Sequence, residues 1–431
     1  MVQKKAQNGN IVAIIMMILL FGMISFVTNL AAPMGVILKS QFALSNSEGF
    51  LGNFANFIAY AVMGIPGGLL LQRVGYKKTA LIAVAVGFIG VFIQFLSGHV
   101  SDTLAFAIYL IGAFVAGFSM TLLNTVVNPM LNTLGGGGNK GNQLIQVGGS
   151  FNSIMATFTP AFVGILIGET AKAHITNVFP VLYIAMGVFA LVFFVLWAVS
   201  IPEPHAEHFS EPLGTLMSGA MKFRHFILGA IGIFCYVGVE VGTPGMAIFW
   251  LSDNPAYGAA IAGSVAGTYW FLMFIGRLFG ASIASKVSSK TMLSVTSSIA
   301  LILIALAIFT PTTSQVTLPL FQKSDAGAIS FGLTQVPINA MFLILVGLCT
   351  SIMWGSIYNL AVEGLGKYLA VASGIFMTLV CGGGIIPWIQ GLVADSAGYI
   401  ISYWVIFAGF AYLLFYALIG SKNVNKNIKV D

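Results

Sequence analysis

Long apolar runs, separated by short polar segments, dominate the pattern along the chain. Each run has about twenty residues or more, the length that a helix needs to cross a hydrocarbon core of roughly 30 Å. An outer-membrane barrel would instead show short segments of alternating polarity. We therefore expect an all-α integral membrane protein with twelve transmembrane helices, at about residues 11–38, 48–72, 79–98, 104–131, 143–168, 178–200, 226–251, 258–285, 291–311, 338–361, 370–394 and 400–420.

The chain is divided and internally repeated. A polar interruption at about residues 201–222 separates the first six predicted helices from the last six. Arg73 and Lys77, after the second helix, correspond to Lys286 and Lys290, after the eighth. A duplicated six-helix unit predicts a substrate site between the two halves, near the middle of the bilayer. The expected organisation is an N-terminal half, a cytoplasmic linker and a C-terminal half, at residues 1–200, 201–225 and 226–431.

Composition and charge support this interpretation. Only 7% of the residues are charged and 58% are apolar, whereas a soluble domain has roughly 25% charged residues. Of the 18 lysines and arginines, all but four fall on the side of the N-terminus; the exceptions are Lys39, Lys172 and Lys323 on the other side and Arg277 within a predicted helix, where it could snorkel to the interface. This bias predicts a multi-pass protein of the cell inner (plasma) membrane with both termini in the cytoplasm. The basic residues stand singly or in pairs, which does not indicate a nucleic-acid partner.

Several motifs resemble those of a known family. Gly68, Arg73, Gly75 and Lys77 resemble the loop signature of the major facilitator superfamily, with Gln72 where the family usually has Asp. The stretches at 234–238, 275–277 and 391–398 resemble the fucose:proton symporter family with its glucose and galactose permeases. The resemblance implies the major facilitator fold, sugar transport by alternating access, and a gating role for the basic loop residues Arg73, Lys77, Lys286 and Lys290.

The sequence also departs from the fucose transporters of that family. Asn29 is followed by Ala31 and Ala32 where those transporters have a carboxylate, and Asn124 stands where they have a glutamate. Gly149 aligns with one of their glutamines. Fucose itself is therefore the less expected substrate.

Glu240 is the acidic residue that falls deep within a predicted helix. A carboxylate at the bilayer centre costs on the order of 2.5–3.5 kcal/mol, so a functional role is the favoured interpretation. It could accept hydrogen bonds from sugar hydroxyls or bind a coupling cation. The alternative is an internally paired glutamate that packs one helix against another. Glucose-type members of the family resemble this chain in carrying Glu at this position.

Neutral polar and aromatic side chains inside the predicted helices complete the candidate substrate site. Amides offer both donors and acceptors to hydroxyl groups, and a ring face can stack on a pyranose. The alternatives are interhelical hydrogen bonds for the amides and ordinary packing for the rings. The candidates, besides Glu240, are Asn29, Asn124, Asn128, Gln146, Asn152, Asn359, Tyr236, Trp270, Trp354 and Trp388.

We therefore expect a sugar importer that works by alternating access, with a hexose or hexose derivative as substrate and a proton or sodium ion as coupling cation. It is expected to be a monomer in the lipid bilayer, without a cofactor or a metal. A multidrug exporter of the same architecture is the alternative, although it would favour an apolar cavity. A membrane enzyme or receptor would need a cluster of catalytic or metal-binding residues in the helices, and a single buried acid does not supply one.

Overall fold

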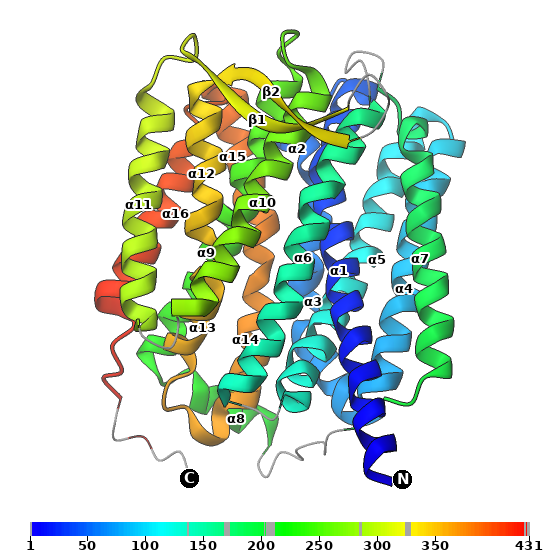
Figure 1. Cartoon of the computed structure of the whole chain (residues 1–431), viewed down its shortest axis with the longest axis vertical. Coiled ribbons are helices and arrows are strands. Elements are labelled where there is room, and N and C mark those ends of the chain that lie inside the picture. The colour runs from blue at the N-terminus through cyan, green and yellow to red at the C-terminus, as the bar shows by residue number, and fades with distance from the viewer. Residues whose placement is uncertain are drawn as a thin grey trace.

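The computed structural model confirms the twelve predicted spans as helices (Figure 1). It describes residues 2–135, 138–167, 173–201, 203, 212–283, 287–323, 329–425 and 428. Helices prevail because hydrocarbon offers no hydrogen-bond partner, so each span must satisfy its own backbone groups. On α7 (Phe179–Ala198), Leu191, Phe194 and Trp197 are exposed on one side, whereas Phe189 and Leu196 are buried against the bundle. The exposed side is the one that suits contact with lipid.

The elements that precede residue 200 are called the N-half below. Asn46–Gly49 is a single turn that links the first two spans. The elements are α1 (Val2–Phe42), α2 (Asn46–Gly49), α3 (Leu51–Val74), α4 (Tyr76–Leu96), η1 (Ser97–His99), α5 (Asp102–Leu134), α6 (Gly138–Ile167), η3 (Ile175–Val178) and α7.

The helices that follow α8 (Leu213–Ala220) are called the C-half, and α8 itself lies within the predicted linker. The tenth and eleventh spans are each interrupted, at Ser351–Ile352 and at η5 (Leu379–Cys381). The other elements are α9 (Arg224–Ser252), α10 (Gly258–Ile283), α11 (Ser289–Phe309), α12 (Ile338–Thr350), α13 (Met353–Val362), η4 (Gly366–Tyr368), α14 (Leu369–Thr378), α15 (Gly382–Ala397), α16 (Tyr403–Phe415) and the π-helical turn η6 (Tyr416–Gly420).

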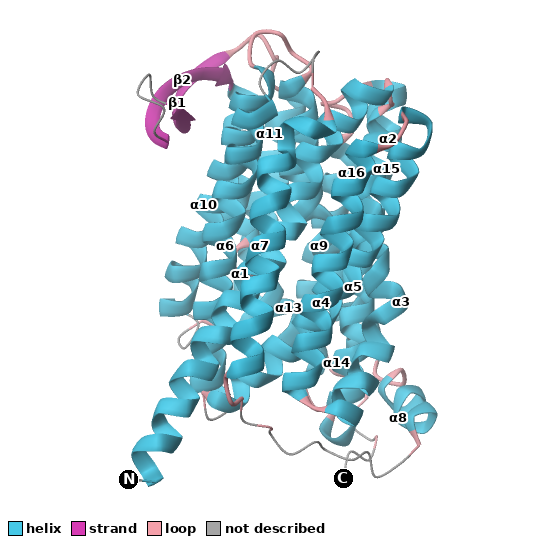
Figure 2. Cartoon of the chain, turned by 90° about the vertical axis from the view of Figure 1, so that its right-hand side faces the viewer, coloured by secondary structure: helices cyan, strands magenta, loops and turns pink. Residues whose placement is uncertain are grey.

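A β-hairpin between the ninth and tenth spans was not predicted from the sequence. Strand β1 (Gln315–Lys323) pairs antiparallel with β2 (Ile329–Pro337), and Gln315 lies opposite Pro337. Phe331 packs its ring 6.0 Å from that of Phe271 on α10. Figure 2 shows the hairpin at one end of the bundle, with α8 and the start of α1 at the opposite end. These are called the hairpin end and the α8 end.

The main contacts between the two halves join α6 with α10, α3 with α14 and α15, α2 with α15, and α1 with α9. The most extensive of these contacts lies between α6 and α10, where Gly164 and Gly263 face each other. Small residues allow such an approach, which is a common basis of helix packing in membranes. Across another pair, the Asn53 side chain on α3 donates to the carbonyl oxygen of Gly383 on α15 at 2.7 Å. A site between the halves can therefore draw its side chains from several helices of both halves.

Candidate functional site

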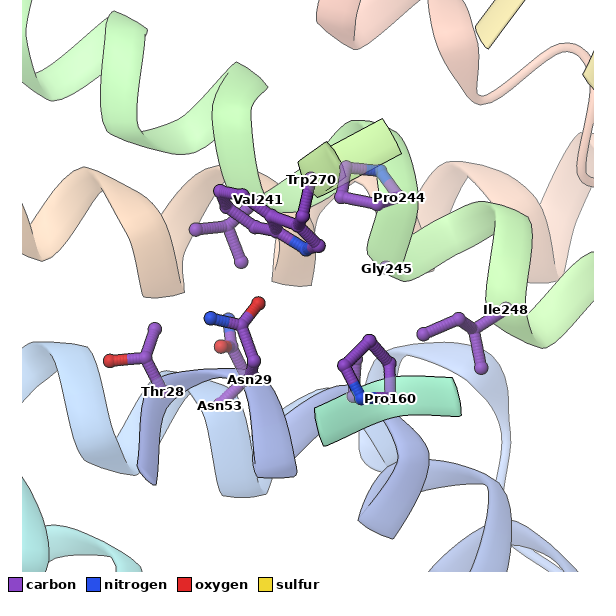
Figure 3. A pocket seen from close by; sticks show the side chains of 10 residues that line it. Thr28, Asn29, Asn53, Pro160, Val241, Pro244, Gly245, Ile248 and Trp270 are labelled. Atoms are coloured by element: carbon purple, nitrogen blue, oxygen red, sulfur yellow. The ribbon is translucent and has the colours of Figure 1, made fainter. Parts of the chain in front are cut away.

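A small cavity of about 20 Å³ lies between the halves, with room for about one water molecule in this conformation. Thr28 and Asn29 stand on one side of it, and Val241 and Trp270 stand on the other (Figure 3). Its lining comes from α1, α3 and α6 in the N-half and from α9 and α10 in the C-half: Thr28, Asn29, Ala32, Asn53, Pro160, Val241, Pro244, Gly245, Ile248 and Trp270. Of the residues predicted for the substrate site, the cavity brings together Asn29 and Trp270.

The polar groups of the cavity keep unused hydrogen-bonding capacity. The Asn29 amide nitrogen donates to the Ser25 carbonyl oxygen at 2.9 Å, which orients the side chain. The amide nitrogen of Asn53 donates a hydrogen bond to the carbonyl oxygen of Gly383. The Oδ1 atom of Asn53 has no hydrogen-bond partner in the described part of the chain. A buried amide oxygen without a partner is costly, so it favours a donor such as a water or a ligand hydroxyl. Asn53 was missed from the sequence, although it carries the same signal as the other amides inside the spans.

Glu240 anchors a second polar group, on α9. Its Oε1 atom accepts a hydrogen bond of 2.7 Å from the hydroxyl of Tyr236, one turn earlier on the same helix. Arg277 of α10 places Nη2 3.9 Å from that oxygen, and its Nη1 atom donates to the carbonyl oxygen of Gly149 on α6. The interpretation of Arg277 as a snorkelling residue is therefore wrong. The guanidinium points into the bundle because the Glu240 carboxylate and the Gly149 carbonyl oxygen interact with it there.

Tyr236 and Trp354 continue this second group. The Tyr236 hydroxyl also lies 3.1 Å from the carbonyl oxygen of Thr350, at the end of α12. The Trp354 ring stands edge-on to that of Tyr236, with centroids 6.1 Å apart. Both predicted aromatic residues thus contact the surroundings of Glu240.

Three predicted amides bond within the N-half. Asn124 donates to the Tyr60 hydroxyl on α3 at 2.7 Å, and Asn128 donates to the carbonyl oxygen of Asn124. Asn152 on α6 donates to the Phe21 carbonyl oxygen on α1 at 3.1 Å. In this conformation, two of the three link neighbouring helices.

The remaining candidates lie apart from the cavity lining. Trp388 stands between the halves, with its ring 5.7 Å from that of Phe54 on α3. Asn359 is exposed on α13. Gln146 belongs to α6, but its side chain falls outside the described residues.

Of the four basic loop residues, Lys77 has local partners at the α8 end. Gly75 has φ +84°, a left-handed conformation that only glycine adopts readily, and it lets α3 turn into α4. Lys77 donates to the carbonyl oxygens of Trp197 and Val199 at the end of α7, at 2.9 and 2.7 Å. Arg73 and Lys290 are exposed, and Lys286 lies outside the described residues. A gating role for these residues stays a prediction.

Two sets of polar contacts join the halves at the hairpin end. Asp395 on α15 accepts from the backbone nitrogens of Asn46 and Ser47 at 2.6 and 2.9 Å, and from the Ser47 hydroxyl at 2.6 Å. Lys39 on α1 forms a 2.8 Å ion pair with Asp253 at the end of α9, and Tyr399 donates to the same carboxylate. Burial and the hydrogen bond to Asp253 raise the pKa of Tyr399, which keeps its hydroxyl a donor. These contacts, called the hairpin-end latch, hold the two halves together at this end.

Replacing Asp395 with Asn is expected to loosen the hairpin-end latch. Hydrogen bonds to a charged acceptor contribute about 1.5–3 kcal/mol, so the closed form should lose roughly tenfold or more in relative population. Spin labels at Thr176 and Ala256, both exposed at this end, would report the change as a longer inter-label distance. Asp102→Asn is the matched control, because Asp102 accepts only from Gln41 within the N-half in the described chain. An unchanged distance distribution in the Asp395 variant would contradict the role of the latch.

Twelve spans arranged as two halves, with a cavity between them that carries three polar side chains, define the class of secondary transporters. The chain belongs to the Major Facilitator Superfamily, whose sequence profile matches residues 14–387. It is 30% identical over 418 residues to a glucose/galactose transporter of Brucella abortus biovar 1 (strain 9-941), covering 94% of this chain and 93% of that protein. It is 22% identical over 388 residues to the L-fucose-proton symporter of Escherichia coli (strain K12), covering 84% and 82%.

The fold agrees with that assignment. A crystal structure of the Major Facilitator Superfamily transporter FucP in the outward conformation superposes with a TM-score of 0.69, at 19% identity, covering 96% of this chain and all of that one. The resemblance to the superfamily and to its fucose and glucose/galactose transporters is thereby confirmed, and the chain is a transporter rather than an enzyme.

Proposed function

We propose that this protein imports a hexose or hexose derivative by alternating access. The observation that carries the proposal is the inter-half cavity, in which Asn29 and Asn53 offer amide groups beside the indole of Trp270. Amides match the mixed donors and acceptors of a sugar, and the ring supplies an apolar face. Relatives named as glucose/galactose transporters over nearly the whole chain support the same substrate class.

The cavity also argues against two other substrates. Ala32 lines it at the position where the resemblance places a carboxylate in the fucose transporters, so a fucose-type relay has no acid there. Most of the cavity lining is apolar, as a multidrug exporter would also favour, so it is the polar side chains Thr28, Asn29 and Asn53 that disfavour a lipophilic cation. The unpartnered Oδ1 atom of Asn53 would then be left desolvated by an apolar ligand, which is unfavourable.

Coupling to a proton or a sodium ion is the second part of the proposal. Glu240 is the carboxylate that lies well inside the spans, and its Oε2 atom has no hydrogen-bond partner among the described residues. A cation that binds there can bias the equilibrium between the inward and outward states by its differential affinity. The candidate sugar contacts outside the cavity lining, such as Asn124 and Asn152, would join the site in another conformation.

We further propose that the protein lies in the inner (plasma) membrane as a monomer, with the α8 end in the cytoplasm. The excess of Lys and Arg at that end supports this orientation. The latch then closes the outer side of the cavity. The halves would rock about the cavity to alternate its access.

Uptake of radiolabelled hexose into proteoliposomes tests the proposal directly. Vesicles with purified protein are expected to take up glucose or galactose faster than protein-free vesicles, and to accumulate it under a proton or a sodium gradient. A lipophilic cation serves as the comparison substrate. If no hexose moves under either gradient while the lipophilic cation does, the sugar proposal is wrong and the exporter alternative replaces it.

A further inference from the structure

Arg277 bridges the two halves of the carrier through a single guanidinium group. Its own helix, α10, and Glu240 on α9 belong to the C-half, whereas Gly149 on α6 belongs to the N-half. Nη1 donates to the Gly149 carbonyl oxygen, and Nη2 faces the Glu240 carboxylate at 3.9 Å. Gly149 has no side chain, and a Cβ atom there would stand 3.2 Å from Nη1. The glycine thus leaves the space that the guanidinium occupies.

The pair with Glu240 is loose in this conformation. A separation of 3.9 Å exceeds the 2.7–2.9 Å that is usual for a charge-assisted hydrogen bond. Both side chains are nevertheless largely buried, with exposed fractions of 14% for Arg277 and 12% for Glu240. A buried charge needs a counter-ion, and removing one partner of such a pair is strongly unfavourable. The guanidinium therefore stands within reach of Glu240 but is held back by a carbonyl oxygen of the other half.

We propose that Arg277 is the internal counter-ion of Glu240 in the sugar-free carrier. When the coupling cation is bound, it neutralises Glu240, and the Gly149 carbonyl retains the guanidinium. When sugar and cation leave, Arg277 closes on Glu240, so the empty site carries no net charge as the halves rock back. Arg277 is thus a positioning residue that permits release of the cation and return of the empty carrier. This inference rests on the proposed function and adds to it a means by which the empty carrier returns in the transport cycle.

Among the titratable groups that face Glu240, Arg277 is the one that can act as its counter-ion. The titratable groups that face the carboxylate are Tyr236 on its own helix and Tyr269 and Arg277 on α10, with Cys349 of α12 beside Tyr269. The two tyrosine hydroxyls are tied to Thr350. Arg277 is the cation among these groups, because a guanidinium is not deprotonated in proteins.

The experiment separates net transport from exchange. Net uptake requires the empty carrier to return, whereas sugar counterflow cycles only the loaded carrier. In proteoliposomes with a proton or sodium gradient, Arg277→Gln is expected to lower net hexose uptake about tenfold or more, because an unpaired carboxylate opposes the return step. Counterflow of labelled hexose should persist. Arg277→Lys, which keeps the charge, should restore most of the net uptake, and Arg224→Gln at the exposed start of α9 is the matched control.

The outcomes are distinct. If Arg277→Gln loses net uptake and counterflow equally, and Arg277→Lys rescues neither, the residue has a structural role and the proposal is overturned. Full accumulation of hexose by Arg277→Gln would overturn it as well.

The double variant Glu240→Gln/Arg277→Gln provides the test if Arg277→Gln does not fold, because it leaves no unpaired charge. It should take up hexose downhill without accumulation, and accumulation by this variant would contradict the proposal. A wild-type protein that carries no hexose in either assay would instead contradict the proposed function.

Discussion

Replacement of Glu240 with Gln is expected to abolish concentrative sugar uptake. A membrane potential of 100 mV is worth about 2.3 kcal/mol per transported charge, which corresponds to an accumulation ratio of about fifty for one coupled cation. Gln keeps an oxygen that accepts from Tyr236 but removes the charge that would bind the cation. The accumulation ratio should therefore fall from about fifty to about one.

The measurement is labelled hexose uptake into proteoliposomes under separate proton and sodium gradients, with the ratio read at steady state. Exchange of sugar at equal concentrations should continue, because the amides of the cavity are untouched in this variant. Glu363→Gln is the matched control, since Glu363 is exposed at the end of α13. A variant that loses all exchange would assign Glu240 to the sugar site, and one that still accumulates sugar would remove Glu240 from coupling.

The helices and one buried acid were predictable because they depend on local properties. Runs of apolar residues determine where a chain can cross a bilayer, and the rarity of acids made Glu240 conspicuous. Asn29 and Trp270 were predicted for the substrate site, and both line the cavity between the halves. Asn53 is an amide inside a span, as Asn29 is, and was therefore equally predictable from the sequence.

Contacts between distant segments could not be predicted in the same way. The contacts of Arg277 depend on which way the end of α10 is turned and on a carbonyl oxygen 128 residues earlier in the chain. The hairpin-end latch joins Asp395 to Ser47 across 348 residues. The Asp395 carboxylate accepts hydrogen bonds from backbone nitrogens, and every residue type except proline has such a nitrogen, so the sequence pattern does not indicate these contacts. The hairpin itself falls in a segment of mixed polarity, where the pairing of Gln315 with Pro337 is set by tertiary packing on α10.

Two constellations, the cavity and the Arg277–Glu240 pair, thus lie on the same inter-half interface. Asn29 and Asn53 come from the N-half and Trp270 from the C-half, so a sugar bound among them would draw the halves together. Gly149 and Glu240 contact the same guanidinium from opposite halves. Movement of one half relative to the other would therefore change both the sugar contacts and the charge balance, which is the physical requirement for coupling.

Replacement of Gly263 with Leu is expected to cause the largest loss of folded, active protein. Gly263 on α10 lies against the backbone of α6, where a Cβ atom would overlap the Pro160 carbonyl oxygen and stand 3.3 Å from Cα of Gly164. Gly267, one turn further along α10, approaches the Thr157 carbonyl oxygen in the same way. The obstacles are backbone atoms, which cannot turn aside as a flexible side chain can. Relief requires the two helices to separate.

Overpacking of this kind costs about 1–3 kcal/mol, and the closeness of the backbone places the variant at or above the upper end of that range. We expect a clear fall in melting temperature in detergent and a loss of hexose counterflow of about tenfold or more. Gly187→Leu is the matched control, because Gly187 is exposed on α7 and a Cβ atom there would meet nothing within 4 Å. Normal stability and counterflow in the Gly263 variant would mean that close contact of α6 with α10 is dispensable. Loss in that variant alone would identify this contact between the halves as one that the carrier must keep while it transports.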